Sequence, residues 1–203
     1  MTGISDIEKQ YAERAQFFAQ YGYDIKRERE AVIAAGGHIK GDVLEVGTGP
    51  GHLTLALARR TARVTSVDID QQKLEEAHAF LSFYGLQDRV RFVRADAGCL
   101  DLSSESFDFV FCANVIHHLA DAFKVVDEML RVSRPGGTIV ISDFNAAGLR
   151  LIARIHQDQG RDHRPENVSI EDVRIYLERK GVPVGRQGTS IQAILIIQRP
   201  NQI

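Results

Sequence analysis

The turn that follows residues 43–46 carries glycines at a spacing suited to holding a ligand. Gly47, Gly49 and Gly51 fall within five residues, directly after an apolar run. Because glycine has no side chain and reaches positive φ at little cost, a ligand can approach such backbone closely. The spacing matches the start of the fingerprint G-x-G-x-x-G, but His52 occupies its sixth position. We therefore predict a ligand loop that differs from a pyrophosphate loop; the alternative is a tight strand-to-helix turn without a ligand.

A carboxylate stands where a nucleoside would need one. Asp68 ends the next apolar segment, 21 residues after Gly47. In open α/β sheets, an acidic residue at this distance accepts hydrogen bonds from the hydroxyls of a ribose. A helix cap is the alternative role, but Asp70 is better placed to cap the helix that follows. The sequence therefore favours a ligand role for Asp68.

Two histidines and a second carboxylate are candidates for proton transfer. His117 and His118 follow a fourth apolar segment, and Asp143 ends a fifth. An imidazole pKa of about 6.5 suits proton transfer near neutral pH. We predict His117 and Asp143 as catalytic residues if the substrate has to lose a proton. Packing, or the start of a helix, is the alternative role for the histidines.

A second histidine pair lies further along the chain. His156 and His163 are seven residues apart and would share one face of a continuous helix, but Gly160 is expected to interrupt that helix. The pair could bind a metal ion or an acidic group of a substrate, and a solvated loop is the alternative. Cys99 and Cys112 lack the spacing of metal ligands, so we predict no metal site, and Cys112 is expected to be a small core hydrophobe.

Strands and helices alternate through the middle of the chain, and this alternation must bring the candidate residues together. Five short apolar segments, each followed by a turn or a helical pattern, indicate a parallel sheet with helices on both faces. Two further strand candidates, 182–187 and 191–200, form a close pair, so one of them should run antiparallel. The predicted fold is α/β: a doubly wound, mostly parallel seven-stranded sheet with helices on both faces and a C-terminal antiparallel strand.

The N-terminal segment has helical periodicity over residues 5–35, with a break near Gly22. Helices that precede the first strand are free to lie over the ligand edge of the sheet. We expect them to form a lid from which Tyr11, Tyr21 and Tyr23 could reach a ligand; core packing is the alternative for these tyrosines.

Length and composition limit the possible classes of protein. A chain of 203 residues suits one domain, which we divide into three parts: a helical lid at 1–37, a cofactor-binding core at 41–144, and substrate-side helices with a terminal hairpin at 145–203. The net charge of −2 argues against a general nucleic-acid or membrane-surface binder. There is no apolar leader and no apolar run of about 18 residues, so we expect a cytoplasmic protein without a membrane partner.

Five successive stretches resemble the motifs of class I S-adenosylmethionine-dependent methyltransferases. They read VLEVGTGPG, VDID, RADA, SFDFVFCANVIHHL and LRVSRPGGTIVISDF. The resemblance covers residues 41–144, about half of the chain. No single motif is decisive, but all five occur in order, each at the end of its expected strand or turn.

The resemblance implies roles for the residues of the first motif. Glu45 should lie near the methionine end of S-adenosylmethionine, where it fixes the glycine loop or meets the ammonium group. The backbone around the methionine and the ribose should be lined by Gly47, Thr48, Gly49 and Gly51.

The resemblance also assigns residues at the ends of the next strands. Asp68 should hold the ribose hydroxyls, and Ile69 should pack on the adenine. Asp96 and Ala97 should meet the adenine edge, with Asp96 accepting from the exocyclic amine. Asn114 should face the sulfonium region. Turn formation is the alternative for Asp96 and Asn114, since both residue types favour turns.

The resemblance implies methyl transfer from S-adenosylmethionine. A small-molecule acceptor is favoured because the net charge is acidic and no Asn/Asp-Pro-Pro-Tyr/Phe signature follows the fourth strand. Whether the accepting atom is O, N, S or C stays open, as does a homo-oligomer. The alternatives are an oxidoreductase that uses a nicotinamide dinucleotide, and a non-catalytic cofactor-binding partner subunit.

Overall fold

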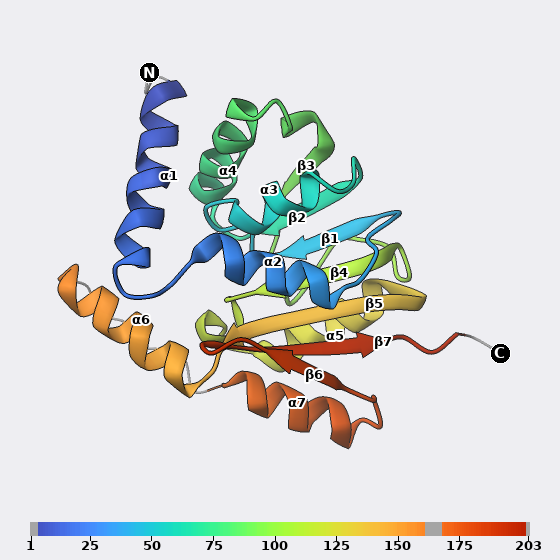
Figure 1. The fold of residues 1–203 in the computed structure, drawn as a ribbon. Coiled ribbons are helices and arrows are strands. Elements are labelled where there is room, and N and C mark those ends of the chain that lie inside the picture. Colours follow the sequence, from blue (N-terminus) through green and yellow to red (C-terminus); the bar gives the residue numbers. More distant parts are fainter. Residues whose placement is uncertain (1–3, 161–167, 202–203) are drawn as a thin grey trace.

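A seven-stranded sheet forms the centre of the protein (Figure 1). The computed structural model describes residues 4–160 and 168–201. The strand order is β3-β2-β1-β4-β5-β7-β6, and β7 is antiparallel to both of its neighbours while the other pairings are parallel. The α/β fold and the antiparallel C-terminal strand expected from the sequence are therefore confirmed. The strands are β1 Val43–Val46, β2 Val64–Asp68, β3 Val90–Arg94, β4 Phe107–Ala113, β5 Ser133–Phe144, β6 Gly185–Gly188 and β7 Gln192–Gln198.

Helices cover both faces of the sheet. One face packs against α5 and α7, and the other against α2, α3 and α4. Neighbouring strand residues alternate between the two cores: Val43 points to the α3 side and Leu44 to the α5 side. The described helices are α1 Ile4–Ala19, α2 Ile25–Ala35, α3 His52–Ala58, α4 Gln71–Phe83, α5 Ala122–Val132, α6 Ala146–Asp158 and α7 Ile170–Arg179, with 3₁₀ turns η1 Gln87–Arg89 and η2 Ile116–His118.

A third apolar cluster lies beyond the sheet. Phe18 of α1 and Ile152 and Ile155 of α6 pack there with Phe144 from the end of β5. Figure 1 shows α1 and α6 beyond the carboxyl ends of the parallel strands. These two helices therefore flank the edge of the sheet where ligands bind in open α/β folds.

Several local predictions are confirmed. Gly22 has a φ of 80° and separates α1 from α2, and Gly160 has a φ of 66° directly after α6. Asp70 caps α4 by accepting a hydrogen bond from the N–H of Gln72 at 2.9 Å. Short polar side chains before a helix satisfy N–H groups that have no partner inside it. Cys112 is buried in the core, and burial raises the pKa of its thiol.

The fifth strand begins earlier than the sequence indicated. The sequence RPGG at residues 134–137 predicts a turn before a strand over 138–144, but β5 includes these residues. The pairing with β4 shifts register between Phe107 and Phe109, which absorbs the irregular segment. A side chain at Gly137 would lie 3.0 Å from the carbonyl oxygen of Asp108, so glycine permits this close approach.

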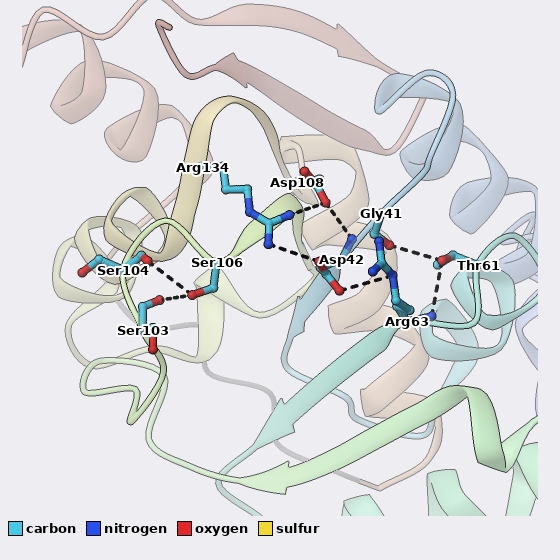
Figure 2. Close-up of polar contacts among 9 residues, drawn as sticks. All are labelled: Gly41, Asp42, Thr61, Arg63, Ser103, Ser104, Ser106, Asp108 and Arg134. Carbon is cyan, nitrogen blue, oxygen red and sulfur yellow. Dashed lines mark hydrogen bonds and ion pairs between the residues drawn. The ribbon is translucent and has the colours of Figure 1, made fainter. Parts of the chain in front are cut away.

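A charged cluster ties the amino ends of the strands together (Figure 2). The Arg134 guanidinium donates to Asp108 Oδ2 at 2.6 Å and to Asp42 Oδ2 at 3.2 Å. Arg63 lies 3.4 Å from the other oxygen of Asp42, and the Asp42 N–H donates to Asp108 at 2.7 Å. The cluster links β1, β2, β4 and β5 at the edge opposite the glycine loop.

Among the described residues, no helix combines the length and the apolar character that crossing a bilayer requires.

Candidate active site

A cavity of about 490 Å³ opens at the carboxyl ends of the parallel strands. Its floor comes from the ends of β1, β2 and β4 and from the residues after β3, and its walls include side chains of α1, α2, η2 and α6. Ligands bind at this position in open α/β sheets, where the strand order reverses between β1 and β4.

The glycines of the loop serve two different purposes, close packing and lining the cavity. A Cβ atom at Gly47 would lie 2.2 Å from Val115, and one at Gly51 would lie 2.9 Å from the Cβ of Ala77 on α4. A Cβ at Gly49 would meet nothing within 4 Å. Gly47, Thr48 and Gly49 line the cavity, whereas Gly51 does not. Gly51 thus brings α3 close to α4, a role that the sequence reasoning did not consider.

Glu45 is buried beneath this loop. Thr54 and Ser66 each donate a hydroxyl hydrogen bond of 2.6 Å to Oε2, and Thr48 lies 2.6 Å from the Ser66 hydroxyl. Oε1 is buried and accepts no hydrogen bond from the described residues. Burial raises the Glu45 pKa to about 7, and the hydroxyls of Ser66 and Thr54 limit the rise. Oε1 is therefore an unsatisfied acceptor beside the cavity, suited to a cation.

Asp68 holds the loop and also lines the cavity. Its Oδ2 accepts from the N–H of Gly49 at 2.9 Å, and its Oδ1 accepts from the N–H of Asp70 at 3.0 Å. A carboxylate oxygen has a second lone pair, so each oxygen can still accept from a hydroxyl. Ile69 lines the cavity with its side chain 65% exposed, which offers an apolar surface to a flat ring.

Asp96, Ala97 and Asn114 also line the cavity. Asp96 accepts a hydrogen bond from the N–H of Gly98 at 2.8 Å. It therefore forms a turn, which is the alternative role that the sequence left open. Asn114 has a φ of 58°, as turn residues of its type tolerate. In the amide orientation that satisfies its neighbours, its oxygen accepts from Arg29 at 3.1 Å and from the Tyr23 hydroxyl at 3.2 Å.

His117 and Asp143 form a buried pair. His117 Nδ1 lies 2.6 Å from Asp143 Oδ1, and the backbone N–H of His117 donates to Asp143 Oδ2 at 3.0 Å. The pair aligns because η2 follows β4 and Asp143 lies on neighbouring β5. His117 lines the cavity, and Asp143 lies behind it without lining it. The carboxylate fixes the imidazole with its proton on Nδ1, so Nε2 carries the lone pair that a general base needs.

Arg29 is the main cavity residue that sequence reasoning missed. It lies on α2 between the buried Ile25 and Ile33, each one turn away, and it lines the cavity. A charged residue within an apolar helical stripe is the signal that could have indicated it. Burial lowers the His52 pKa to about 3, and the positive charges of Arg29 and Arg14 add to this effect. The positive field is thus concentrated beside the glycine loop.

The three tyrosines of the N-terminal segment have different surroundings. Tyr23 lines the cavity, whereas Tyr11 stacks on Phe80 at 3.4 Å between ring centroids. Tyr21 donates to Asp158 of α6 at 2.6 Å. Core packing, the alternative interpretation, therefore describes Tyr11, and Tyr21 joins α1 to α6.

His156 lines the cavity from the last turn of α6. Its predicted companion, His163, lies outside the described residues. Within the part of the chain that the structure describes, no three histidine, cysteine or acidic side chains gather closely enough to hold a metal ion.

Comparison with known proteins decides the family. The family model described as "Methyltransferase domain" matches residues 44–141, which include the glycine loop, Asp68 and the histidine pair. The chain belongs to the class I S-adenosylmethionine-dependent methyltransferases. Its family uses S-adenosylmethionine as methyl donor, in agreement with the sequence prediction and against a nicotinamide dinucleotide.

Individual methyltransferases resemble the chain over its core. Methyltransferase GfsG of Streptomyces halstedii is 38% identical over 120 residues, which are 59% of this chain and 42% of that protein. The 27-O-demethylrifamycin SV methyltransferase of Amycolatopsis mediterranei (strain S699) is 30% identical over 145 residues, 69% of this chain and 53% of that protein. The chain thus spans about half the length of these relatives. A SAM-dependent methyltransferase from Aquifex aeolicus has the same fold, with a TM-score of 0.66, 24% identity and coverage of 84% and 88% of the two chains.

The cavity residues fit S-adenosylmethionine. The donor carries an ammonium group, a carboxylate, a ribose and a cationic sulfur, and it has no pyrophosphate. The unsatisfied Oε1 of Glu45 suits the ammonium, and the positive charge of Arg29 suits the carboxylate. Asp68 suits the ribose hydroxyls, and the exposed Ile69 suits the adenine.

Proposed function

We propose that this methyltransferase transfers the methyl group of S-adenosylmethionine to a hydroxyl oxygen of a small organic molecule, with His117 as general base. The observation that carries the proposal is the 2.6 Å contact between His117 Nδ1 and Asp143 Oδ1 at the wall of the cavity. Asp143 acts as a positioning residue, because it holds the ring of His117 and does not line the cavity itself.

The presence of a held base favours a hydroxyl acceptor. A bound sulfonium supplies an activated methyl group, so alignment and exclusion of water account for much of the rate. An unprotonated amine already presents a lone pair, whereas a hydroxyl becomes a strong nucleophile only as it loses its proton. An imidazole whose Nδ1 is held by a carboxylate accepts that proton at Nε2 and becomes a cation that the carboxylate stabilises.

The size and lining of the cavity favour a small acceptor. A volume of about 490 Å³ is within the range of about 300–1,000 Å³ typical of small-molecule sites. The wall between α1 and β5 is apolar, formed by Phe18, Tyr23, Phe144 and Ile152. The name of the relative from Amycolatopsis also refers to an oxygen on a small molecule.

The cofactor contacts proposed from the sequence extend to Arg29. In this assignment Glu45 Oε1 accepts from the ammonium and Arg29 donates to the carboxylate. Asp68 accepts from the ribose hydroxyls, and Asp96 accepts from the adenine amine. Asn114 lies beside the sulfonium.

The test is methyl transfer from labelled S-adenosylmethionine to a panel of phenols, alcohols, amines and thiols. We expect product with the hydroxyl acceptors. His117→Gln should lower kcat by about 10²–10⁴-fold, and Asp143→Asn should lower kcat and shift the pH profile while leaving cofactor affinity nearly unchanged. His78→Gln, on the exposed surface of α4, is the matched control.

Two results would contradict the proposal. Preferred methylation of amines with a kcat indifferent to His117→Gln would show that no base is needed. Tight cofactor binding with no turnover on any acceptor would instead favour the non-catalytic partner subunit.

A further inference from the structure

Arg29 and Asn114 come from distant parts of the chain and meet at the wall of the cavity. In the amide orientation that satisfies its neighbours, the Asn114 oxygen lies 3.3 Å from Nη1 and 3.1 Å from Nη2 of Arg29. A guanidinium carries several N–H donors in one plane. An acceptor shared by its two terminal nitrogens therefore fixes the direction of that plane and leaves other donors for a ligand.

Further contacts hold Asn114 itself. The Tyr23 hydroxyl donates to the same amide oxygen at 3.2 Å, and the backbone N–H of Asn114 donates to the carbonyl of Ser142 on β5 at 2.9 Å. Asn114 has a φ of 58°, a backbone conformation that asparagine adopts more readily than most residues. Tyr23 is buried, and its ring packs edge-on against Phe18 and Phe144. The amide oxygen is therefore held in place by contacts from several elements.

The helix that carries Arg29 is anchored as well. Glu28, the preceding residue on α2, is buried and accepts a hydrogen bond of 2.7 Å from the hydroxyl of Thr189, in the turn between β6 and β7. Asp24 caps the helix by accepting from the N–H of Arg27 at 3.0 Å. Successive residues of a helix point in different directions. Glu28 can therefore fasten α2 to the sheet while Arg29 reaches the cavity.

The charge of Arg29 acts on residues at both ends of the glycine loop. Glu45 precedes the loop and His52 follows it, and both line the cavity together with Arg29. Burial raises the Glu45 pKa and lowers the His52 pKa; the charge of Arg29 limits the first shift and adds to the second. The guanidinium is therefore directed towards the loop that is assigned to the methionine part of the donor.

We infer that Asn114 and Tyr23 are positioning residues for donor binding: through the amide oxygen of Asn114 they hold the Arg29 guanidinium in the orientation that meets the carboxylate of S-adenosylmethionine. This inference rests on the proposed contact between Arg29 and that carboxylate. It gives Asn114 a role that acts through Arg29, in addition to its proposed position beside the sulfonium. A guanidinium that is already held loses less conformational freedom when the donor binds, so the carboxylate is bound more tightly.

Paired ligands test the inference without turnover. Calorimetry compares S-adenosylhomocysteine with decarboxylated S-adenosylhomocysteine, which keeps the amine, the sulfur and the nucleoside. The ratio of the two dissociation constants measures recognition of the carboxylate, because effects common to both ligands cancel. We expect the wild-type protein to prefer S-adenosylhomocysteine by about 10-fold or more. Arg29→Gln should remove most of this preference.

Two variants test whether Asn114 and Tyr23 act through Arg29. Asn114→Gly removes the amide oxygen at a φ that glycine tolerates, and Tyr23→Phe removes only a hydroxyl. Each should lower the preference by about 3-fold or more. In an Arg29→Gln background, Asn114→Gly should have no further effect on the preference, because residues that act through one another are not additive. Tyr84→Phe, at an exposed tyrosine that does not line the cavity, is the matched control.

The inference would be overturned if Asn114→Gly and Tyr23→Phe left the preference unchanged, or if Asn114→Gly lowered it further in the Arg29→Gln background. Either result would leave the proposed Arg29 contact in place. A preference that Arg29→Gln does not alter would instead refute that contact, and the inference with it. Proton transfer by the His117–Asp143 pair is measured separately with the acceptor panel.

Discussion

Glu45 is a buried carboxylate whose two oxygens have different surroundings. Oε2 accepts two hydroxyl hydrogen bonds, whereas Oε1 is buried and accepts none from the described residues. His117 is also buried, but a carboxylate holds it on one side. At the residue scale, the site thus combines Glu45, whose Oε1 can accept a hydrogen bond from a cation, with His117, which Asp143 orients for proton transfer.

The raised pKa of Glu45 predicts that cofactor binding depends on pH. A pKa of about 7 in the folded protein, against 4.5 ordinarily, means that the folded protein holds a proton which the unfolded chain loses. The free energy of unfolding without ligand should therefore fall as pH rises from 4.5 to 7. An ammonium ion needs the charged carboxylate, so affinity for S-adenosylhomocysteine should rise with pH up to about 7, with proton release at pH 6 in calorimetry across buffers.

Glu45→Gln should abolish this proton release and lower the affinity. Glu75→Gln, on the exposed side of α4, is the control. An affinity that falls between pH 5.5 and 7 in the wild-type protein would contradict the role given to Glu45.

The proposed roles of Asp68 and His117 predict a difference in cofactor binding. Asp68→Ala should weaken binding of S-adenosylhomocysteine by roughly 1.5–3 kcal/mol, because a charged acceptor for two hydroxyls is lost. His117→Ala should change this affinity much less, since His117 is assigned to the acceptor. Calorimetry measures both; equal effects would contradict the assignment.

At the scale of elements, the glycine loop separates two requirements that the sequence presents as one motif. Gly51 begins α3 at a φ of 82° and lies against Ala77, whereas Gly49 has open space beside it. A short loop thus fixes how α3 packs on α4 and also leaves bare backbone beside the cavity.

Alanine substitutions should separate the two requirements. Gly51→Ala should lower the free energy of unfolding by about 2–4 kcal/mol, from backbone strain at positive φ and overpacking against Ala77. Gly49→Ala should cost only the strain, about 1–2 kcal/mol, but it should weaken cofactor binding. Urea unfolding and calorimetry measure the two effects. Gly85→Ala measures the backbone strain alone, because Gly85 has a φ of 65° and a Cβ atom there would meet nothing within 4 Å. If Gly51→Ala lowered the free energy of unfolding no more than Gly85→Ala does, the packing role of Gly51 would be refuted.

At the scale of the whole molecule, the two ends of the parallel strands have different roles. The cavity lies at the carboxyl ends, and the charged cluster around Arg134 joins the amino ends (Figure 2). The four strands that the cluster joins also carry the cavity floor and the His117–Asp143 pair at their other ends. Stability and binding are therefore expected to be separable.

Arg134→Gln tests that separation. The Arg134 side chain is 37% exposed, so solvent weakens its ion pairs, and the loss of unfolding free energy should be about 1 kcal/mol or less. Affinity for S-adenosylhomocysteine should stay within about twofold of the wild-type value, because the substitution lies at the opposite edge. A larger loss of affinity would show that the two edges are coupled.

Local patterns accounted for much of the fold. Apolar strands, amphipathic helices and the helix cap at Asp70 could be predicted because each depends on residues close in the chain. The segment before residue 138 was misjudged because its inclusion in β5 depends on pairing with β4.

By itself, the sequence determined that strand ends carry glycines, Asp68, His117 and Asp143, because parallel strands bring their carboxyl ends to one edge. Only the tertiary structure decided that Asp143 stands behind His117 and that Arg29 enters the cavity. Both contacts join segments distant in the chain, and their geometry follows from strand order, register and the packing of α2, which no local pattern specifies.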